Sequence, residues 1–200
     1  MRLWQKSNAV LAAIGVAVFA TSWSASAQAS GYCFYNNTSE GVKRGDVTFN
    51  GIVATDCYGV VEGNIAGQGT SYSGADILNG MAWGKNWVYV DATDEINRHY
   101  KGLNLSLSAT GSTTGSWSLT GTDANGSVAL NLPVLLDVVI ALKAGTKYAL
   151  WAFNDVVIDG NDQGTFQVVF ANPGMQQPDF SHLLIFAREA AAGTINERDD

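Results

Sequence analysis

The chain has 200 residues, of which 46% are hydrophobic, 10% aromatic and only 14% charged, with 22 glycines and 3 prolines. This composition is too apolar for a disordered chain, and it lacks the Ala, Glu, Lys and Leu enrichment of a helical bundle or coiled coil. A formal net charge of −7 argues against nucleic acid as a partner, because binding to phosphates needs clustered Lys and Arg. The length predicts one domain.

The N-terminal segment has the pattern of a secretory signal peptide. Two basic residues precede an apolar run at 9–19, and small residues near Ala27 and Ala29 offer two cleavage positions. The run is shorter than the roughly 20 residues that a membrane-spanning helix needs, so we expect no membrane span in the mature chain. We expect residues 1–27 to be removed on export, which leaves nine basic residues against 18 acidic ones and a net charge of −9.

Cys33 and Cys57 are the only cysteines of the chain. In an oxidising compartment such a pair predicts a disulfide, and their spacing does not match a redox or metal motif. A loop of this length gives about 3.5 kcal/mol of stabilisation in the chain-entropy model. The bridge would fix the N-terminal segment to the strand that contains Cys57.

Short strand-like runs follow in chain order, separated by Gly, Asn, Asp and Ser. Residues 103–109 alternate between apolar and polar, as a half-buried strand does, whereas 134–143 are almost continuously apolar. A helix is conceivable at 134–143, but its β-branched residues favour a strand buried on both faces. The Gly- and Ser-rich residues 63–80 predict a long loop.

The expected strands are 46–54, 57–62, 86–91, 103–109, 116–120, 134–143, 147–153, 156–159, 165–171 and 182–187. Nine or ten short strands without a reliable long helix predict an all-β fold. We expect an antiparallel β-sandwich, jelly-roll-like, over residues 30–188, followed by a flexible polar tail at 189–200.

The segment 155–164 has two interpretations. The oxygen-bearing side chains of Asp155, Asp159, Asn161 and Asp162 are typical of the start of a calcium loop. The glutamate that closes such a loop is missing, since Phe170 occupies its position. An ordinary turn uses Asp, Asn and Gly for backbone reasons alone, and it is the alternative interpretation.

Aromatic residues offer a candidate sugar-binding platform. Trp83 and Trp87 flank a turn that contains Gly and Lys, so we expect them to be the exposed pair on which a sugar ring stacks. The alternative is that they fill the core of the sandwich together with the other aromatic residues, which include Trp117 and Trp151.

No catalytic constellation emerges from the sequence. Ser181 and His182 are adjacent, and adjacent residues of a strand point to opposite faces, so they do not form a nucleophile–base pair. His99, the other histidine, lies in a polar stretch that predicts a surface loop. Glycoside hydrolysis needs two opposed carboxylates, and the sequence offers Glu62, Asp91, Glu95 and Asp155 without placing any two across a cleft.

An ordered set of segments resembles one group of bacterial secreted proteins. The segments are Ala-Thr-Asp-Cys-Tyr-Gly-Val-Val-Glu-Gly-Asn at 54–64, Gly-Ser-Trp-Ser-Leu at 115–119, Leu-Asp-Val-Val-Ile-Ala-Leu-Lys-Ala at 136–144, Asp-Gly-Asn at 159–161, Gly-Thr-Phe at 164–166 and Pro-Asp-Phe-Ser-His-Leu at 178–183. Together they are similar to ectodomains of the exosortase-sorted, PEP-CTERM group. The resemblance implies a β-sandwich exported by polysaccharide-producing Gram-negative bacteria, and it supplies no catalytic residue.

Members of that group end in Pro-Glu-Pro, an apolar span and a basic tail, whereas residues 188–200 here are polar. We therefore expect free secretion or matrix association rather than sorting by that route. The expected function is a non-enzymatic, structural or adhesive role at the cell surface or in the extracellular matrix, with polysaccharide or other surface proteins as partners. The alternatives are a carbohydrate-binding module, with calcium as its only candidate cofactor, and a glycan-processing enzyme.

Overall fold

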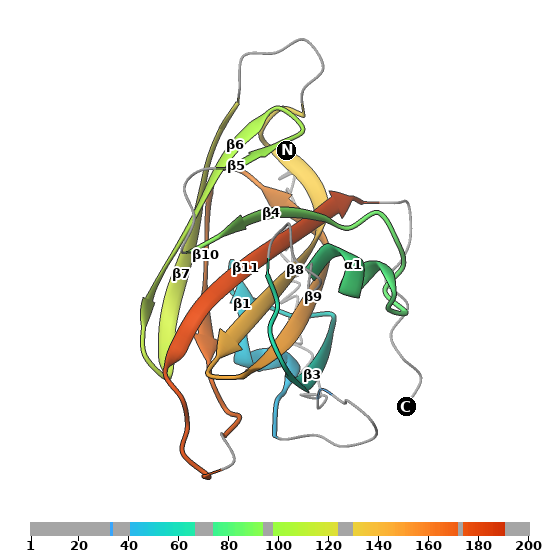
Figure 1. Ribbon diagram of the computed structural model, residues 1–200. Helices are drawn as coiled ribbons and strands as arrows, with labels where there is room; N and C mark the ends of the chain where they lie inside the picture. Colours follow the sequence, from blue (N-terminus) through green and yellow to red (C-terminus); the bar gives the residue numbers. More distant parts are fainter. Residues whose placement is uncertain are drawn as a thin grey trace, which may run out of the picture.

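The computed structural model describes residues 33, 41–66, 74–93, 98–123, 130–171 and 174–190 (Figure 1). The predicted signal peptide and residues 191–200 of the predicted tail lie outside these ranges. The described strands form antiparallel sheets that pack face to face, which confirms the predicted β-sandwich. No helix within these ranges is long and apolar enough to cross a membrane.

Two large sheets and one short hairpin make up the fold (Figure 1). The four-stranded sheet has the order β10 (Asn161–Gln167), β7 (Thr114–Asp123), β6 (Leu103–Gly111) and β5 (Arg98–Tyr100). The five-stranded sheet has the order β3 (Asp56–Glu62), β9 (Lys147–Ile158), β8 (Val134–Ala144), β11 (Phe180–Glu189) and β4 (Val88–Ala92). The hairpin of β1 (Thr48–Phe49) and β2 (Ile52–Val53) lies beside β10 after the 3-10 turn η1 (Arg44–Asp46), and the described α-helix is α1 (Gly74–Asn79).

The core lies between the two large sheets, where alternate side chains of each sheet meet. The predicted alternation at 103–109 is confirmed, because the leucines of β6 point inward and the residues between them point outward. Burial of such apolar surface supplies the main favourable free energy of folding. The core residues include Leu103, Leu105, Leu107, Trp117, Val138, Ile140, Leu142, Trp151, Phe153 and Ile185.

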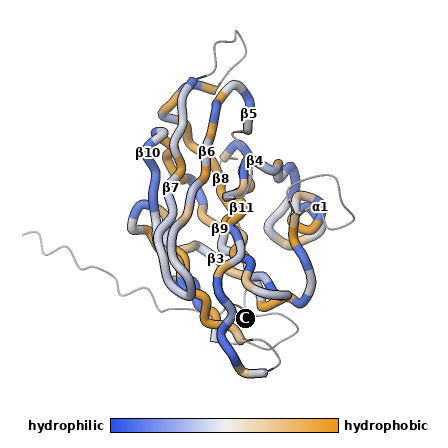
Figure 2. The backbone as a smooth tube through the Cα atoms, turned by 60° about the vertical axis from the view of Figure 1, so that its left-hand side comes forward, coloured by the Kyte–Doolittle hydropathy of each residue, from blue (hydrophilic) through white to orange (hydrophobic). Residues whose placement is uncertain are grey.

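The five-stranded sheet is buried on its outer face as well. Figure 2 shows α1 on the side of this sheet opposite to β6, β7 and β10. Leu78 of α1 packs there with Val139, Leu150 and Phe186, which alternate with the inward-pointing residues of β8, β9 and β11. This second cluster explains the continuous apolar run at 134–143 and confirms that it is a strand buried on both faces.

Several local predictions differ from the structure. The strand predicted at 165–171 is β10, which begins four residues earlier and ends at Gln167, and β5 was not among the expected strands. The run 46–54 is not one strand, because Asn50 and Gly51 both have positive φ (47° and 78°) and form a hairpin turn between β1 and β2. Residues 147–158 form one strand instead of two, with Asp155 (φ 50°) at a bulge. The predicted loop at 63–80 contains α1.

The disulfide and one buried carboxylate tie the edges of the sandwich. The predicted bridge between Cys33 and Cys57 is present, and it links the N-terminal segment to the edge strand β3. At the other end, β5 pairs with only the first residues of β6. Asp91 of β4 is fully buried, and its Oδ2 accepts a hydrogen bond of 2.7 Å from the backbone N–H of Leu107. The Asp91 side chain therefore accepts the hydrogen bond of the Leu107 N–H, which lies beyond the residues of β6 that pair with β5.

Candidate functional site

The two tryptophans predicted to be exposed are buried instead. Trp83 is 1% exposed and Trp87 is 2% exposed, so the predicted stacking platform is wrong. The indole N–H of Trp83 donates to Asp56 Oδ2 at 2.5 Å, and the Trp83 and Tyr58 rings pack in a T-shaped arrangement with ring centres 6.4 Å apart. The loop after α1 folds onto the outer face of the five-stranded sheet, and this packing removes both indoles from solvent. Core filling was the alternative interpretation, and it is the correct one.

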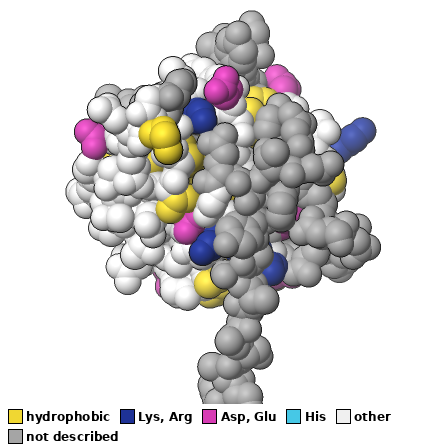
Figure 3. All heavy atoms as spheres, turned by 90° about the horizontal axis from the view of Figure 1, so that it is seen from below, with side chains coloured by type: hydrophobic (Ala, Val, Ile, Leu, Met, Phe, Trp, Pro, Cys, Tyr) yellow, Lys and Arg dark blue, Asp and Glu magenta, His cyan; other side chains and the backbone are white. Residues whose placement is uncertain are grey.

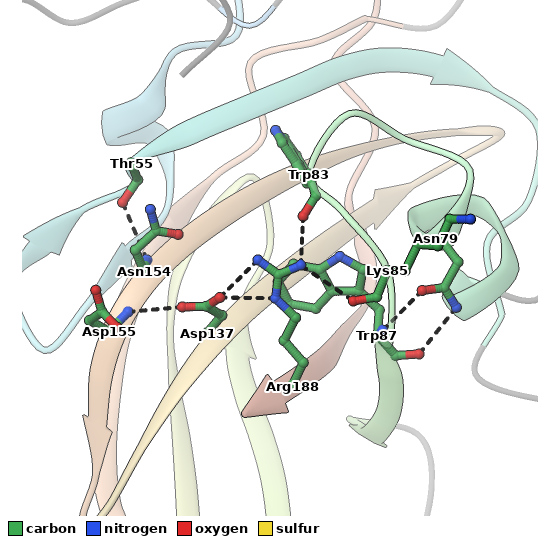
Figure 4. A network of polar contacts seen from close by, with 9 residues as sticks. All are labelled: Thr55, Asn79, Trp83, Lys85, Trp87, Asp137, Asn154, Asp155 and Arg188. Atoms are coloured by element: carbon green, nitrogen blue, oxygen red, sulfur yellow. Dashed lines mark hydrogen bonds and ion pairs between the residues drawn. The ribbon is translucent and has the colours of Figure 1, made fainter. Parts of the chain in front are cut away.

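A buried ion pair lies beside these tryptophans (Figure 4). Arg188 of β11 donates through Nε to Asp137 Oδ2 of β8 at 2.9 Å, and its Nη2 lies 2.9 Å from the same oxygen. The guanidinium lies 4.4 Å from the centre of the Trp87 ring, and its Nη1 donates to the backbone oxygen of Trp83 at 2.7 Å. Arg188 thus holds the 83–87 loop against the sheet through charge, stacking and hydrogen bonding.

Asn79, the last residue of α1, completes this attachment. Its Oδ1 accepts from the backbone N–H of Trp87 at 2.9 Å, and its Nδ2 donates to the Trp87 oxygen at 3.4 Å (Figure 4). The polar groups of Arg188 and Asn79 are therefore directed at Asp137 and at the protein's own backbone. The network positions a loop rather than presenting reactive groups to a ligand.

Sequence reasoning missed this ion pair, although one feature pointed to it. Asp137 is a carboxylate in the middle of the apolar run 134–143, and a buried charge requires a partner. The partner lies 51 residues further along the chain, and only the pairing of β8 with β11 brings it opposite Asp137.

The four predicted calcium ligands do not converge on one point. Asp155 lies at the bulge in β9, where its backbone N–H donates to Asp137 Oδ1 at 3.1 Å. Asp159 Oδ1 accepts from the backbone N–H of Asn161 at 2.8 Å, as in a local Asx turn. The remaining candidate, Asp162, is 1% exposed, and its two oxygens accept from the Asn50 side chain at 2.8 Å and from the backbone N–H of Gly160 at 3.3 Å.

Carboxylate oxygens of Asp159 and Asp162 thus accept hydrogen bonds from N–H groups, and a cation would need these same oxygens as ligands. Burial raises the pKa of Asp162, and the hydrogen bond from Asn50 opposes that rise. The described part of the chain contains no group of three or more His, Cys, Asp or Glu side chains placed to hold a metal ion. This geometry favours the alternative of an ordinary turn joining β9 to β10, and calcium binding stays a prediction.

The candidate catalytic residues are also dispersed. Glu62 ends β3 and Asp91 lies in β4, which are the two opposite edge strands of the five-stranded sheet. Asp91 accepts a hydrogen bond from the backbone N–H of Leu107, and Glu95 lies outside the described ranges. His99, predicted in a loop, lies in β5 with an exposed side chain, while His182 lies in β11.

A cleft opens where edges of the two large sheets meet. It has a volume of about 720 Å³ and lies between β5 of one sheet and β4 and the end of β11 of the other. The ion pair of Lys101 with Glu189 connects the two sheets here. The lining residues are Lys85, Asn86, Val88, Tyr100, Lys101, Arg188, Glu189 and Ala190.

The outer face of the four-stranded sheet presents an ordered polar surface. The outward side chains of β6, β7 and β10 are all hydroxyls or amides, and none of them is charged. Cross-strand pairs link them, with Ser108 and Ser118 at 2.8 Å and Thr110 and Ser116 at 3.4 Å. We call this surface the hydroxyl face; its rows are Asn104–Thr122, Ser106–Thr120–Asn161, Ser108–Ser118–Gln163 and Thr110–Ser116–Thr165.

The hydroxyl face is hollowed at one end. A depression of about 320 Å³ is lined by residues of β6 and β7 that include Asn104, Ser106, Thr120 and Thr122. Within the described ranges, the buried side-chain oxygen of Asn104 has no hydrogen-bond partner. On another face, seen from below in Figure 3, several Lys, Arg, Asp and Glu side chains are scattered among uncharged ones.

Comparisons with known proteins give no match. No family model matches the chain, and no curated protein or solved structure matches it.

Proposed function

We propose that the protein is an exported, non-enzymatic β-sandwich that acts at the cell surface or in the extracellular matrix by binding neutral, hydroxyl-rich polymers on its hydroxyl face. The observation that carries this proposal is the array of hydroxyl and amide groups across β6, β7 and β10, with no charge among them. Sugar hydroxyls both donate and accept hydrogen bonds, as Ser, Thr, Asn and Gln side chains do.

The charge distribution supports a neutral partner. Soluble domains commonly have surfaces with roughly 25–35% charged residues, which keep other molecules apart. The hydroxyl face has no such charges, so an uncharged polymer meets it without displacing counterions. Asn104 lines the depression, and its buried side-chain oxygen has no partner among the described residues, so an acceptor is left unsatisfied at this end of the face.

The disulfide supports the location. Bridges such as Cys33–Cys57 persist in oxidising compartments and are rare in the cytosol. This agrees with the signal-peptide pattern of the sequence and with the resemblance to bacterial secreted proteins. We accordingly assign the proposed binding to the outside of the cell.

The experiment is a pull-down of the purified, disulfide-bonded protein with cellulose and starch as neutral polymers and alginate as an acidic one. We expect retention on a neutral polymer, and a roughly tenfold loss in Thr120→Glu, which places a charge beside the depression. Gln176→Glu is the matched control, because it adds the same charge at an exposed position outside the face.

Failure of every neutral polymer to retain the protein would overturn the proposal. So would equal losses in the Thr120 and Gln176 variants, because the face would then have no special role. Release of soluble sugar from a retained polymer would show that the glycan-processing alternative is correct.

A further inference from the structure

The cleft between the two sheets has features of a small-molecule site that the hydroxyl face does not use. Its volume of about 720 Å³ falls in the range typical of ligand pockets. None of its lining residues belongs to the hydroxyl face. Ligand binding in this cleft can therefore be tested separately from the proposed binding of polymers.

The charges that line the cleft leave one cation in excess. Arg188 is neutralised by the buried Asp137, and Lys101 pairs with Glu189. Lys85 is exposed, and its ammonium group has no partner within the described ranges. In a protein with a net charge of −7, an excess cation in a cleft favours an anionic ligand there.

Tyr100 contributes a buried donor. Its side chain is 2% exposed and lines the cleft, and its hydroxyl has no hydrogen-bond partner within the described ranges. Burial, with a smaller contribution from the Glu189 carboxylate, raises the pKa of Tyr100 to about 12. The hydroxyl therefore keeps its proton at neutral pH, and within the described ranges this buried donor is left unsatisfied.

We propose that this cleft binds a small carboxylate that also bears hydroxyl groups, such as a sugar acid. The carboxylate contacts the ammonium groups of Lys85 and Lys101, and a ligand hydroxyl accepts from Tyr100 and donates to Glu189. Ammonium groups select the anion, while the phenol and the carboxylate select the hydroxyls. Neither a plain carboxylate nor a neutral sugar satisfies all four groups.

The test is a calorimetric titration of the full disulfide-bonded protein with glucuronate, glucose and acetate. We expect glucuronate to bind at least roughly tenfold more tightly than either glucose or acetate, since each of these lacks one class of contact. Glucuronate affinity is expected to fall roughly three- to tenfold in Tyr100→Phe, which removes only the hydroxyl, and by a similar factor in Lys85→Gln. Lys143→Gln is the matched control, because Lys143 lies outside the cleft and donates to Gly145.

Thermal unfolding of each variant separates loss of binding from loss of structure. Tyr100→Phe is expected to melt no lower than the wild type, because the deleted hydroxyl has no partner among the described residues. No binding of glucuronate, equal binding of acetate and glucuronate, or unchanged affinity in both Tyr100→Phe and Lys85→Gln would overturn the proposal.

Discussion

The outer faces of the two large sheets differ, because one is covered by other parts of the chain and the other faces solvent. On the five-stranded sheet, α1 and the 83–87 loop cover the outer face, and the ion pair of Arg188 with Asp137 lies beneath this cover. On the four-stranded sheet, the hydroxyl face is open and carries no charge. Charged groups are thus used to build the covered side, while uncharged polar groups are left for contact on the open side.

This difference separates structural from functional polar groups. A buried charge is costly without a partner, so the polar atoms of the covered side are directed at one another and at the backbone. The hydroxyls of the open face bond across strands but keep further donor and acceptor capacity toward solvent. A polar side chain that faces outward from the four-stranded sheet is therefore expected to matter for binding more than for stability.

The largest effect is expected from breaking the buried ion pair. Arg188→Met leaves Asp137 buried without its cation, so the free energy of unfolding should fall by about 3–5 kcal/mol in urea titrations. The double variant Arg188→Met/Asp137→Leu removes both charges and should regain most of that loss. A loss below about 1 kcal/mol in the single variant would show that the pair does not hold the cover in place.

Truncation of the helix should have the next largest effect. Leu78 of α1 is fully buried against the five-stranded sheet, and Leu78→Ala should cost about 3 kcal/mol through lost burial and the cavity left behind. Ile77, its half-buried neighbour, supplies the control, and Ile77→Ala should cost clearly less in the same urea titrations. Equal costs would mean that α1 covers the sheet without a preferred face.

A smaller, pH-dependent effect is expected at Asp162. Because burial raises the pKa of this carboxyl in the folded state, its stabilising contribution is present below the unfolded pKa of about 3.9 and is lost as pH rises through the folded value. The unfolding free energy of the wild type, relative to that of Asp162→Asn, should therefore decline as pH rises through this window. Asp46→Asn should give the same sign, since burial also raises the pKa of Asp46. A rising difference in urea titrations would contradict this.

The smallest effect on stability is expected on the hydroxyl face. Ser108 is exposed, and Ser108→Ala should change the unfolding free energy by no more than about 0.5 kcal/mol. Its neighbour Leu107 points into the core, and Leu107→Ala should cost several times more by the same measurement. Similar costs at the two positions would remove the distinction between the faces of the four-stranded sheet.

Local patterning predicted the sheets well. Alternation at 103–109 predicted an open sheet with one wet face, and the apolar run at 134–143 predicted a strand covered on both sides. The pair Cys33 and Cys57 predicted the disulfide from compartment and count alone. The two strands depend on the pattern of neighbouring residues, and the disulfide depends on the number of cysteines, so both can be obtained from the sequence alone.

Contacts between distant segments limited the prediction of sites. Trp83 and Trp87 flank turn residues, which favours exposure, but Arg188 folds over Trp87 from a strand about a hundred residues away. Asp162 looks like a metal ligand beside Asp159, yet Asn50 reaches it from the hairpin of β1 and β2. The local sequence around Trp87 and around Asp162 does not indicate that Arg188 and Asn50 are their partners.

The carboxylate of Asp91 has a consequence for how the protein behaves in a crowded surrounding. An unpaired strand edge is a template on which another chain can add a strand and begin to aggregate. By holding the N–H of Leu107, Asp91 keeps this stretch of β6 from serving as such a template. Asp91 thereby protects this edge of the four-stranded sheet against uncontrolled association with other copies of the protein.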